Sequence, residues 1–323
     1  MNVLVTSNCN RRCPYCFAAS RISFGDGPPR PAPRVISRDD FREALAFAKR
    51  GGVPVLGMLG GEPSLHPEFV DLVQEVLQEG VEVKVFTNGI WREGDVERLS
   101  ERVKDAGPRL RLVVNTNHPD ITPEREQQAQ RRLFRALGRF CTLSYNIYQA
   151  EPAMLFLPDL ILEYGLVRHV RLGLAQPLAD GESSHVPVED YSRVAPHILD
   201  LARRCDESDI TLGFDCGFTL CMFTPEEVGQ LQLAGCAVRA TCGPAVDVGT
   251  DLSVWACFPL ATLDRGARLS EFPDMRSLTT YFDERFRRLY RTGAMEKCVD
   301  CRHLRRGQCS GGCAAHVYRS VNP

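Results

Sequence analysis

The stretch that decides the fold is the apolar run Asn2-Val-Leu-Val-Thr6 and, two residues later, the loop Cys9-Asn-Arg-Arg-Cys13-Pro-Tyr-Cys16. The run is a short strand pattern, and the loop brings three thiols to the end of that strand. Thiolates ligate both zinc and iron–sulfur clusters, but a structural zinc site takes four ligands, and no fourth Cys or His follows nearby. A cluster held by three thiolates keeps one iron open for another ligand. We therefore predict an iron–sulfur site at Cys9, Cys13 and Cys16, with a zinc knuckle as the alternative.

Strand and helix patterns alternate along the chain after this loop. Short runs rich in Val, Leu and Ile predict parallel, covered strands at residues 2–6, 53–59, 82–87, 110–116, 141–148 and 169–175. Helical patterns between and after them span residues 38–50, 69–79, 93–106, 122–137, 153–165 and 188–209. This order predicts an α/β fold, a parallel barrel or part of one, with an open doubly wound sheet as the alternative. In either fold, ligand sites lie at the carboxyl ends of the strands.

The composition excludes several classes of protein. A net charge of −2 over 323 residues is too small for a dedicated nucleic-acid surface. No apolar run approaches the ~20 residues that span a bilayer, and the first strand is too short for a signal peptide. We therefore expect a cytoplasmic protein with no membrane partner. The 14 cysteines gather in clusters, and in a large cytoplasmic chain such clusters favour metal binding over disulfides.

Polar residues stand at the ends of successive predicted strands. They are Gly60-Gly61-Glu62-Pro63, Thr87-Asn88-Gly89, Asn115-Thr116-Asn117, Asn146 and Arg171. Any one of them alone would be interpreted as a turn or a cap. Together with the cysteine loop they surround a common mouth, which is the arrangement expected of a catalytic site.

The C-x₃-C-x₂-C spacing, the aromatic Tyr15 before its last cysteine, and the Gly-Gly-Glu-Pro turn resemble the radical S-adenosylmethionine (radical SAM) enzymes. The resemblance implies a partial (β/α)₆ TIM barrel over residues 1–209 and a [4Fe–4S] cluster whose unique iron binds the amino and carboxylate groups of SAM. It implies SAM contacts from Tyr15, Gly60, Gly61, Glu62, Pro63, Asn88, Asn115, Asn117, Asn146, Arg171 and Leu174. Such enzymes cleave SAM with one electron, from a reductant such as flavodoxin or ferredoxin. The resulting 5′-deoxyadenosyl radical abstracts a hydrogen atom from the substrate.

Beyond residue 209 the regular alternation stops, so we expect residues 210–323 to form a small, loop-rich, cysteine-ligated domain. Its cysteines follow the patterns Cys236-x₅-Cys242-x₁₄-Cys257 and Cys298-x₂-Cys301-x₇-Cys309-x₃-Cys313. These patterns resemble the SPASM extension of radical SAM enzymes, which holds two auxiliary [4Fe–4S] clusters. The resemblance implies that the first is held by Cys236, Cys242, Cys257 and Cys313, and the second by Cys298, Cys301 and Cys309. Zinc ribbons are the alternative.

The fourth ligand of the second auxiliary cluster is open at this point. The family's last cysteine has no counterpart after Cys313, so Cys216 or Cys221 could supply the ligand. Otherwise one iron is open or the second cluster is lost, which leaves one or two auxiliary clusters. The same two cysteines are also candidates for a catalytic thiol that donates a hydrogen atom to a substrate radical, or for bystanders.

The resemblance implies an oxidoreductase that modifies a ribosomally made peptide by crosslinking, epimerisation or oxidation. A small-molecule dehydrogenase or oxidoreductase on the same machinery is the alternative. Phe258 stands where relatives that mature sulfatases carry an acidic residue, so we do not expect that activity. An iron–sulfur electron carrier without a substrate is disfavoured, because it would have no use for a SAM pocket.

Overall fold

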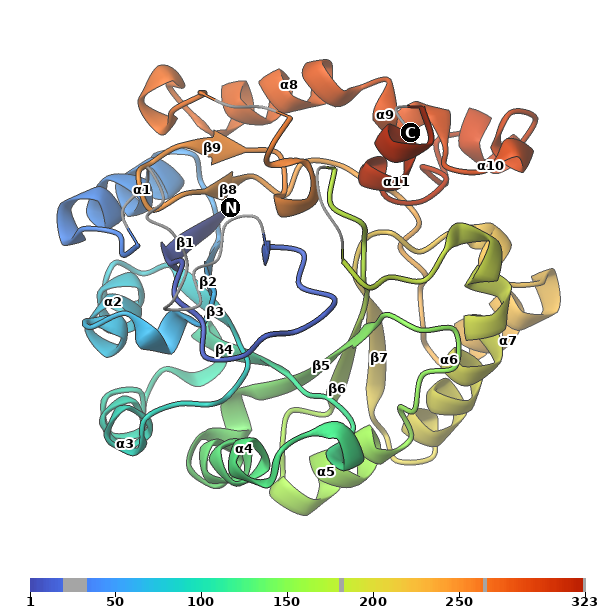
Figure 1. Ribbon diagram of the computed structural model, residues 1–323. Coiled ribbons are helices and arrows are strands. Elements are labelled where there is room, and N and C mark those ends of the chain that lie inside the picture. The colour runs from blue at the N-terminus through green and yellow to red at the C-terminus, as the bar shows by residue number, and fades with distance from the viewer. Residues whose placement is uncertain (20–33, 180–182, 264–265, 322–323) are drawn as a thin grey trace.

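The computed structural model describes residues 1–19, 34–179, 183–263 and 266–321, and its centre is one curved sheet (Figure 1). The strand order is β7-β6-β5-β4-β3-β2-β1-β8-β9. Neighbours are parallel from β7 to β8, and β9 is antiparallel to β8. The strands are β1 (Asn2–Thr6), β2 (Val55–Gly60), β3 (Glu82–Thr87), β4 (Leu110–Asn115), β5 (Cys141–Ile147), β6 (His169–Leu174), β7 (Thr211–Phe214), β8 (Asp247–Val248) and β9 (Val254–Trp255).

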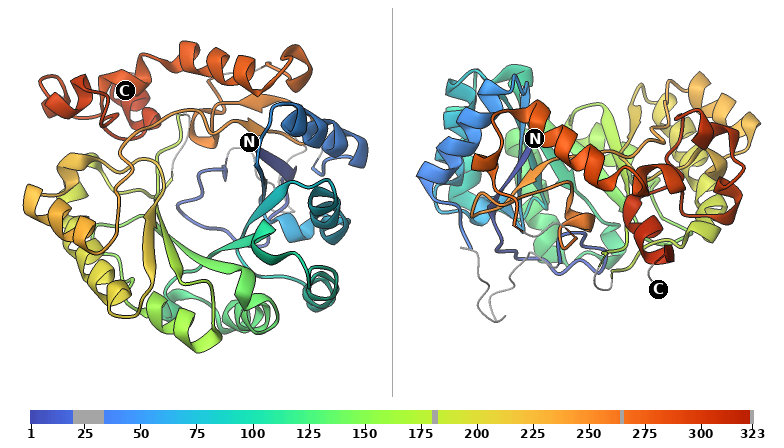
Figure 2. Two further views of the ribbon diagram at one scale, coloured as in Figure 1. Left: turned by 180° about the vertical axis from the view of Figure 1, so that it is seen from behind. Right: turned by 90° about the horizontal axis from the view of Figure 1, so that it is seen from above.

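Helices cover the outer face of the sheet, as the views from behind and from above also show (Figure 2). They are α1 (Arg38–Arg50), α2 (Phe69–Gln78), α3 (Glu93–Arg102), α4 (Glu124–Leu137), α5 (Phe156–Tyr164), α6 (Tyr191–Asp206), α7 (Pro225–Leu233), α8 (Met275–Phe286), α9 (Leu289–Thr292), α10 (Arg302–Arg305) and α11 (Ala314–Val321). Among the described residues, no helix is both long and apolar enough to cross a membrane.

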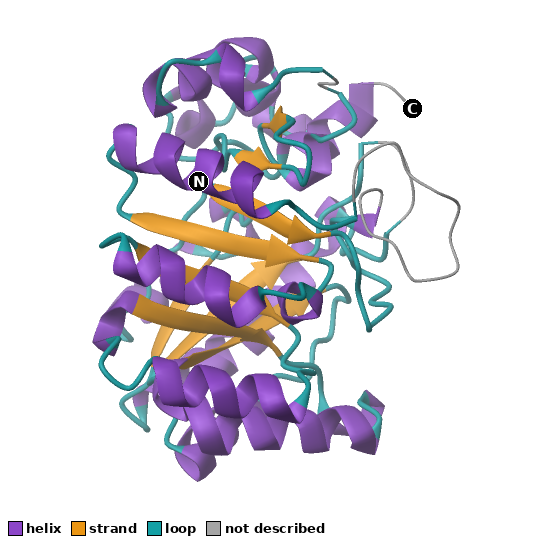
Figure 3. Ribbon diagram, turned by 90° about the vertical axis from the view of Figure 1, so that its left-hand side faces the viewer, coloured by secondary structure: helices purple, strands orange, loops and turns teal. Residues whose placement is uncertain are grey.

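The predicted α/β partial barrel is confirmed. Strands β1 to β7 follow one another in sequence order, whereas a doubly wound sheet reverses direction at a switch point. The residues at the two ends of α1 act as the sequence predicts. The Ser37 hydroxyl accepts a hydrogen bond from the Asp40 N–H at 3.1 Å at the start of α1, and Gly51 ends that helix. The side view shows the carboxyl ends of the strands and their loops gathered on one side (Figure 3).

Residues beyond 209 continue both the sheet and the core. Strand β7 pairs with β6, and β8 pairs with β1, where the Asn2 amide donates to the Asp247 carboxylate at 2.7 Å. Fully buried Leu278 and Phe282 of α8 belong to the same apolar core as Phe41 of α1. The C-terminal region is thus less dependent on metal than its sequence indicates, and the division at residue 209 stays a prediction.

Replacing Phe282 by Ala should destabilise the whole chain. Truncating a fully buried phenylalanine leaves a cavity and costs about 3–5 kcal/mol. Because α8 shares its core with the barrel, we expect one cooperative thermal transition, shifted to lower temperature, in circular dichroism of the anaerobically purified protein. Leu233→Ala, at a side chain that is 90% exposed, is the control and should not shift it. A separate early transition beside an unchanged main one would contradict the shared core.

Candidate active site

The cysteine loop is held against the end of β2 by backbone contacts. The Gly61 N–H donates to the Thr6 carbonyl at 2.9 Å, and the Glu62 N–H donates to the Asn8 carbonyl at 2.8 Å. A Cβ atom on Gly61 would lie 2.3 Å from the Asn8 oxygen and 2.7 Å from the Cys9 Cβ. No side chain fits in that space, so glycine is what allows the loop to approach the turn so closely.

The Glu62 carboxylate ties the end of β2 to the end of β3. Glu62 is fully buried and accepts hydrogen bonds from the Thr87 hydroxyl at 2.7 Å, the Asn88 N–H at 2.7 Å and the Ser64 N–H at 3.2 Å. Burial raises the pKa of Glu62, while the donors stabilise its charged form and act in the opposite direction. The fold itself engages this carboxylate, and a direct contact between Glu62 and SAM stays a prediction.

A chain of hydrogen bonds connects the cysteine loop to β4 and β5. The Asn115 amide donates to the Tyr15 hydroxyl at 2.9 Å, and that hydroxyl donates to the Asn117 side chain. The Asn146 amide in turn donates to the Asn115 side-chain oxygen at 2.8 Å. The Tyr15 ring stacks on Tyr148 with the centroids 4.8 Å apart. Burial raises the pKa of Tyr15, so its hydroxyl remains a neutral donor.

Arg171 of β6 contacts side chains from the neighbouring strands of the barrel. Its guanidinium donates to the Ser144 hydroxyl at 3.0 Å and pairs with Asp215, the residue that follows β7. Its Cζ also lies 5.4 Å from the centroid of the Phe86 ring. Leu174 is buried at the carboxyl end of the same strand. These contacts hold the Arg171–Asp215 pair two residues before the position on β6 that is in register with Asn146.

The remaining predicted SAM contacts also surround the cysteine loop. Gly60 ends β2, and buried Pro63 opens a short 3₁₀ turn directly behind it. The Asn88 side chain donates to the Asn10 side-chain oxygen at 2.8 Å, which joins the loop to β3. The structure therefore gathers at one mouth the residues that the sequence placed at separate strand ends.

The three N-terminal thiols are half-buried. Burial raises the pKa of Cys9 to about 11 and that of Cys16 to about 12, and it also raises the pKa of Cys13. A thiol loses its proton when it ligates iron, so in this partly buried site the iron replaces the proton. Three thiols from one loop fit a [4Fe–4S] cluster that keeps one iron position open.

The buried contacts of the cysteine loop were not predicted from the sequence. Arg11, inside the cysteine motif, forms a salt bridge with Glu126 of α4 at 2.6 Å and donates to the Asn115 carbonyl at 3.3 Å. Buried Gln130 of α4 donates to the carbonyls of Asn88 at 2.7 Å and Asn115 at 3.1 Å. The only sequence signal for Arg11 is its position between two predicted ligands. Nothing in the sequence indicates that Glu126 is its partner.

The C-terminal cysteines form two groups. Cys242, Cys257 and Cys313 are neighbours, and so are Cys298, Cys301 and Cys309. Near the first group lies the buried hydroxyl of Tyr290, which has no hydrogen-bond partner among the residues that the structure describes. An orphaned donor fits a bound group with acceptor atoms, such as the sulfides of a cluster. In the described part of the chain, no three Cys, His, Asp or Glu side chains are arranged to hold a single metal ion, as zinc would require.

The other three predicted site cysteines have different surroundings. Cys236 is buried near Leu212 of β7 and Cys205 of α6. Cys216 and Cys221 lie after the carboxyl end of β7 and are exposed. The predicted roles of Cys216 and Cys221, as ligands or as catalytic thiols, depend on which of the two cysteine groups each one lies near.

Residues 3–146 match the radical SAM superfamily. The chain thus contains a radical SAM domain over these residues. It is 29% identical to GTP 3′,8-cyclase from Limosilactobacillus fermentum over 127 residues, which are 38% of this chain and 36% of that one. It is 26% identical to GTP 3′,8-cyclase from Listeria monocytogenes over 123 residues, or 37% and 34% of the two chains. The chain thus spans about a third of the length of these curated relatives.

Solved structures share the fold over nearly all of this chain. Streptococcus suis SuiB bound to S-adenosylmethionine superposes with a TM-score of 0.66 at 16% identity, covering 97% of this chain and 72% of SuiB. The anSMEcpe structure with bound AdoMet superposes with a TM-score of 0.66 at 15% identity, covering 99% and 94%. The fold likeness extends through the C-terminal cysteine region. The family implies a [4Fe–4S] cluster and SAM as cofactors.

Gly61→Ala should remove the N-terminal cluster. The added methyl group would lie 2.3 Å from the Asn8 oxygen, so the cysteine loop must shift. We expect a loss of about four irons and four sulfides per chain after anaerobic reconstitution, measured chemically and by electron paramagnetic resonance (EPR). Gly94→Ala is the matched control, because nothing lies within 4 Å of a Cβ there. An unchanged iron content in Gly61→Ala would show that the close approach is not needed to form the site.

Proposed function

We propose that this chain is a radical SAM enzyme that modifies a peptide, by crosslinking, epimerising or oxidising one of its residues. When bound, the [4Fe–4S] cluster and SAM supply the one-electron chemistry that removes a hydrogen atom from the substrate. The chain's own residues hold SAM and the substrate C–H bond in line and keep water away from them. We further propose that the electron comes from a flavodoxin or ferredoxin.

For SAM itself we propose the residues at the barrel mouth. The backbone of residues 60–63 takes the methionine amino group, and Asn115 and Asn117 reach the ribose. Asn146 and Arg171 lie near the carboxylate and ribose, while Tyr15 and Leu174 flank the adenine. The continuous hydrogen bonding from Tyr15 through Asn115 to Asn146 supports this assignment, because it holds the polar groups in place before any ligand arrives.

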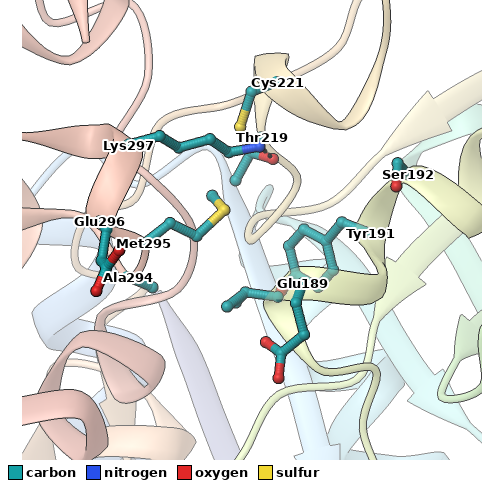
Figure 4. Close-up of a pocket in the computed structure, with 10 residues that line it drawn as sticks. Glu189, Tyr191, Ser192, Thr219, Cys221, Ala294, Met295, Glu296 and Lys297 are labelled. Atoms are coloured by element: carbon teal, nitrogen blue, oxygen red, sulfur yellow. Dashed lines mark hydrogen bonds between the residues drawn. The ribbon is translucent and has the colours of Figure 1, made fainter. Parts of the chain in front are cut away.

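The observation that carries the peptide proposal is a cavity between the barrel and the C-terminal region (Figure 4). Its volume is about 450 Å³, and it is partly open to solvent. Glu189 and Tyr191 line it from the barrel side, and Met295 and Lys297 line it from the C-terminal side. Cys221 lines one end. A partly open cavity walled by both regions suits an extended chain better than a small molecule enclosed on all sides.

Two comparisons favour different substrates. SuiB has been solved bound to its precursor peptide SuiA, and that structure superposes on this chain with a TM-score of 0.67 at 16% identity, covering 97% of this chain and 71% of SuiB. The second candidate, a small-molecule oxidoreductase, is favoured by the likeness to GTP 3′,8-cyclases, which extends over 38% of this chain. We prefer the peptide because the cavity includes the C-terminal region, and because the SuiB likeness includes that region as well.

One anaerobic assay separates the two substrate classes. The enzyme, SAM and dithionite are incubated either with a pool of synthetic linear peptides or with GTP, and 5′-deoxyadenosine and substrate masses are measured. We expect peptides to stimulate 5′-deoxyadenosine formation and a deuterium-labelled peptide to transfer its label to it. Glu189→Lys, which reverses a charge in the cavity, should raise the KM for an active peptide, while the exposed control Glu207→Lys should not. Stimulation by GTP and by no peptide would favour the second candidate.

Cys13→Ala should abolish SAM cleavage. The variant loses one of three thiolates, so we expect about four fewer irons per chain and no 5′-deoxyadenosine under strong reductant. Cys141→Ala is the control, because Cys141 is a fully buried core cysteine outside both cysteine-rich regions. SAM cleavage that persisted in Cys13→Ala at the wild-type rate would contradict the assignment of the N-terminal cluster.

A further inference from the structure

The loop that follows β7 carries Cys216 and Cys221 and packs against the turn near the end of the C-terminal region. The Thr219 methyl group lies 3.8 Å from the position that a Cβ on Gly312 would take. Both cysteines are exposed, although the neighbouring Thr219 is fully buried. Thr219 thus packs into the protein, while the two cysteine side chains on either side of it remain accessible. The loop therefore carries two exposed thiols, five residues apart, beside the turn that precedes Cys313.

Cys221 faces the group of Cys298, Cys301 and Cys309. The cavity in Figure 4 has Cys221 on one wall and, on another, the segment that leads into Cys298. A Cβ on Gly311 would lie 3.0 Å from the Cys298 sulfur, and the Gly311 N–H donates to the Cys309 sulfur at 3.2 Å, so these two thiols share one turn. Cys221, Cys309 and Cys301 are the thiols within electrostatic range of Cys298. Together with the shared cavity, this places Cys221 next to the group.

Cys216 faces the other group. The Cys242 N–H donates to the Ser310 hydroxyl at 2.9 Å, which brings Cys242 to the turn that carries Cys313. The short 3₁₀ helix that follows Cys257 packs against α11, the helix that starts directly after Cys313. Cys216 lies within electrostatic range of Cys257, Cys242 and Cys313. Cys216 is thus a fourth thiol around one centre.

Cys236 does not reach that centre. Its sulfur interacts with the backbone of Leu212 near the start of β7, and Cys205 of α6 is the neighbouring thiol. Leu212 precedes Cys216 by four residues, which is up to about 13 Å of extended chain. Cys236 is also almost fully buried in the apolar core. It therefore lies towards the opposite end of β7 from the thiols that the spacing pattern would join to it.

We propose that the loop after β7 supplies the fourth ligand of each of two auxiliary [4Fe–4S] clusters, and that Cys236 is a core cysteine. The first set is Cys216, Cys242, Cys257 and Cys313, and the second is Cys221, Cys298, Cys301 and Cys309. Both auxiliary sites are then closed by four thiolates, so neither Cys216 nor Cys221 is free to donate a hydrogen atom. The proposal rests on the auxiliary clusters of the proposed function and not on the peptide substrate, so a failed peptide assay leaves it unaffected.

The test uses the full chain with Cys9, Cys13 and Cys16 all replaced by Ala, which leaves only the auxiliary sites. After anaerobic reconstitution and removal of small thiols, this background should bind about eight irons per chain. Adding Cys216→Ala or Cys221→Ala should each remove about four irons, and adding Cys236→Ala, the matched control, should remove none. If an Ala variant does not fold by circular dichroism, the corresponding Ser variant should keep iron and change the EPR spectrum of one cluster.

Two results would overturn the assignment. The first is a Cys236→Ala variant that loses a cluster while Cys216→Ala or Cys216→Ser leaves iron content and the EPR spectrum unchanged. The second is a background protein that binds only about four irons, because one of the two thiol sets would then hold no cluster. Both readouts are independent of SAM cleavage and of any substrate.

Discussion

The close approach of the Gly61 backbone to the Asn8 backbone is the contact on which the mouth of the barrel depends. Because no Cβ fits between them, the cysteine loop can fold back over the end of β2 and present its thiols beside the turn. The next residue, Glu62, is drawn into the barrel, where its buried carboxylate holds the start of the following loop through Thr87 and Asn88. One short turn thus positions both the cluster loop and two strand ends.

The polar groups of the mouth are organised by the protein before any ligand binds. Asparagines at the ends of β4 and β5 bond to each other and to Tyr15, and beneath them Arg11 and Glu126 form a salt bridge across the loop. Arg11 is buried and Glu126 is partly buried, so removing either partner would leave a poorly solvated charge without its counterion. The pair therefore helps to keep the loop in one position. Radical chemistry requires a fixed, dry site, and this network provides the fixed part of it.

The six strands before residue 175 and the cysteine loop could be predicted because long apolar runs and a dense motif determine them locally. Strand β7 was missed because it is four residues long and contains Gly213, which weakens its pattern. The pairing of Arg11 with Glu126 joins residues 115 positions apart, and no local signal reports such a contact. The same limit applies to the auxiliary cysteines: spacing identified the cysteine-rich segments, but only the path of the loop after β7 separates Cys216 and Cys221 from Cys236.

We propose one cluster site that is open at an iron and two that are closed by protein thiolates. Mössbauer spectra of the chain reconstituted with ⁵⁷Fe, recorded with and without SAM, test this difference directly. We predict that SAM changes the signal of a single iron in about twelve and leaves the auxiliary clusters unchanged. A SAM-dependent change in the auxiliary clusters, or no change in any cluster, would contradict the account.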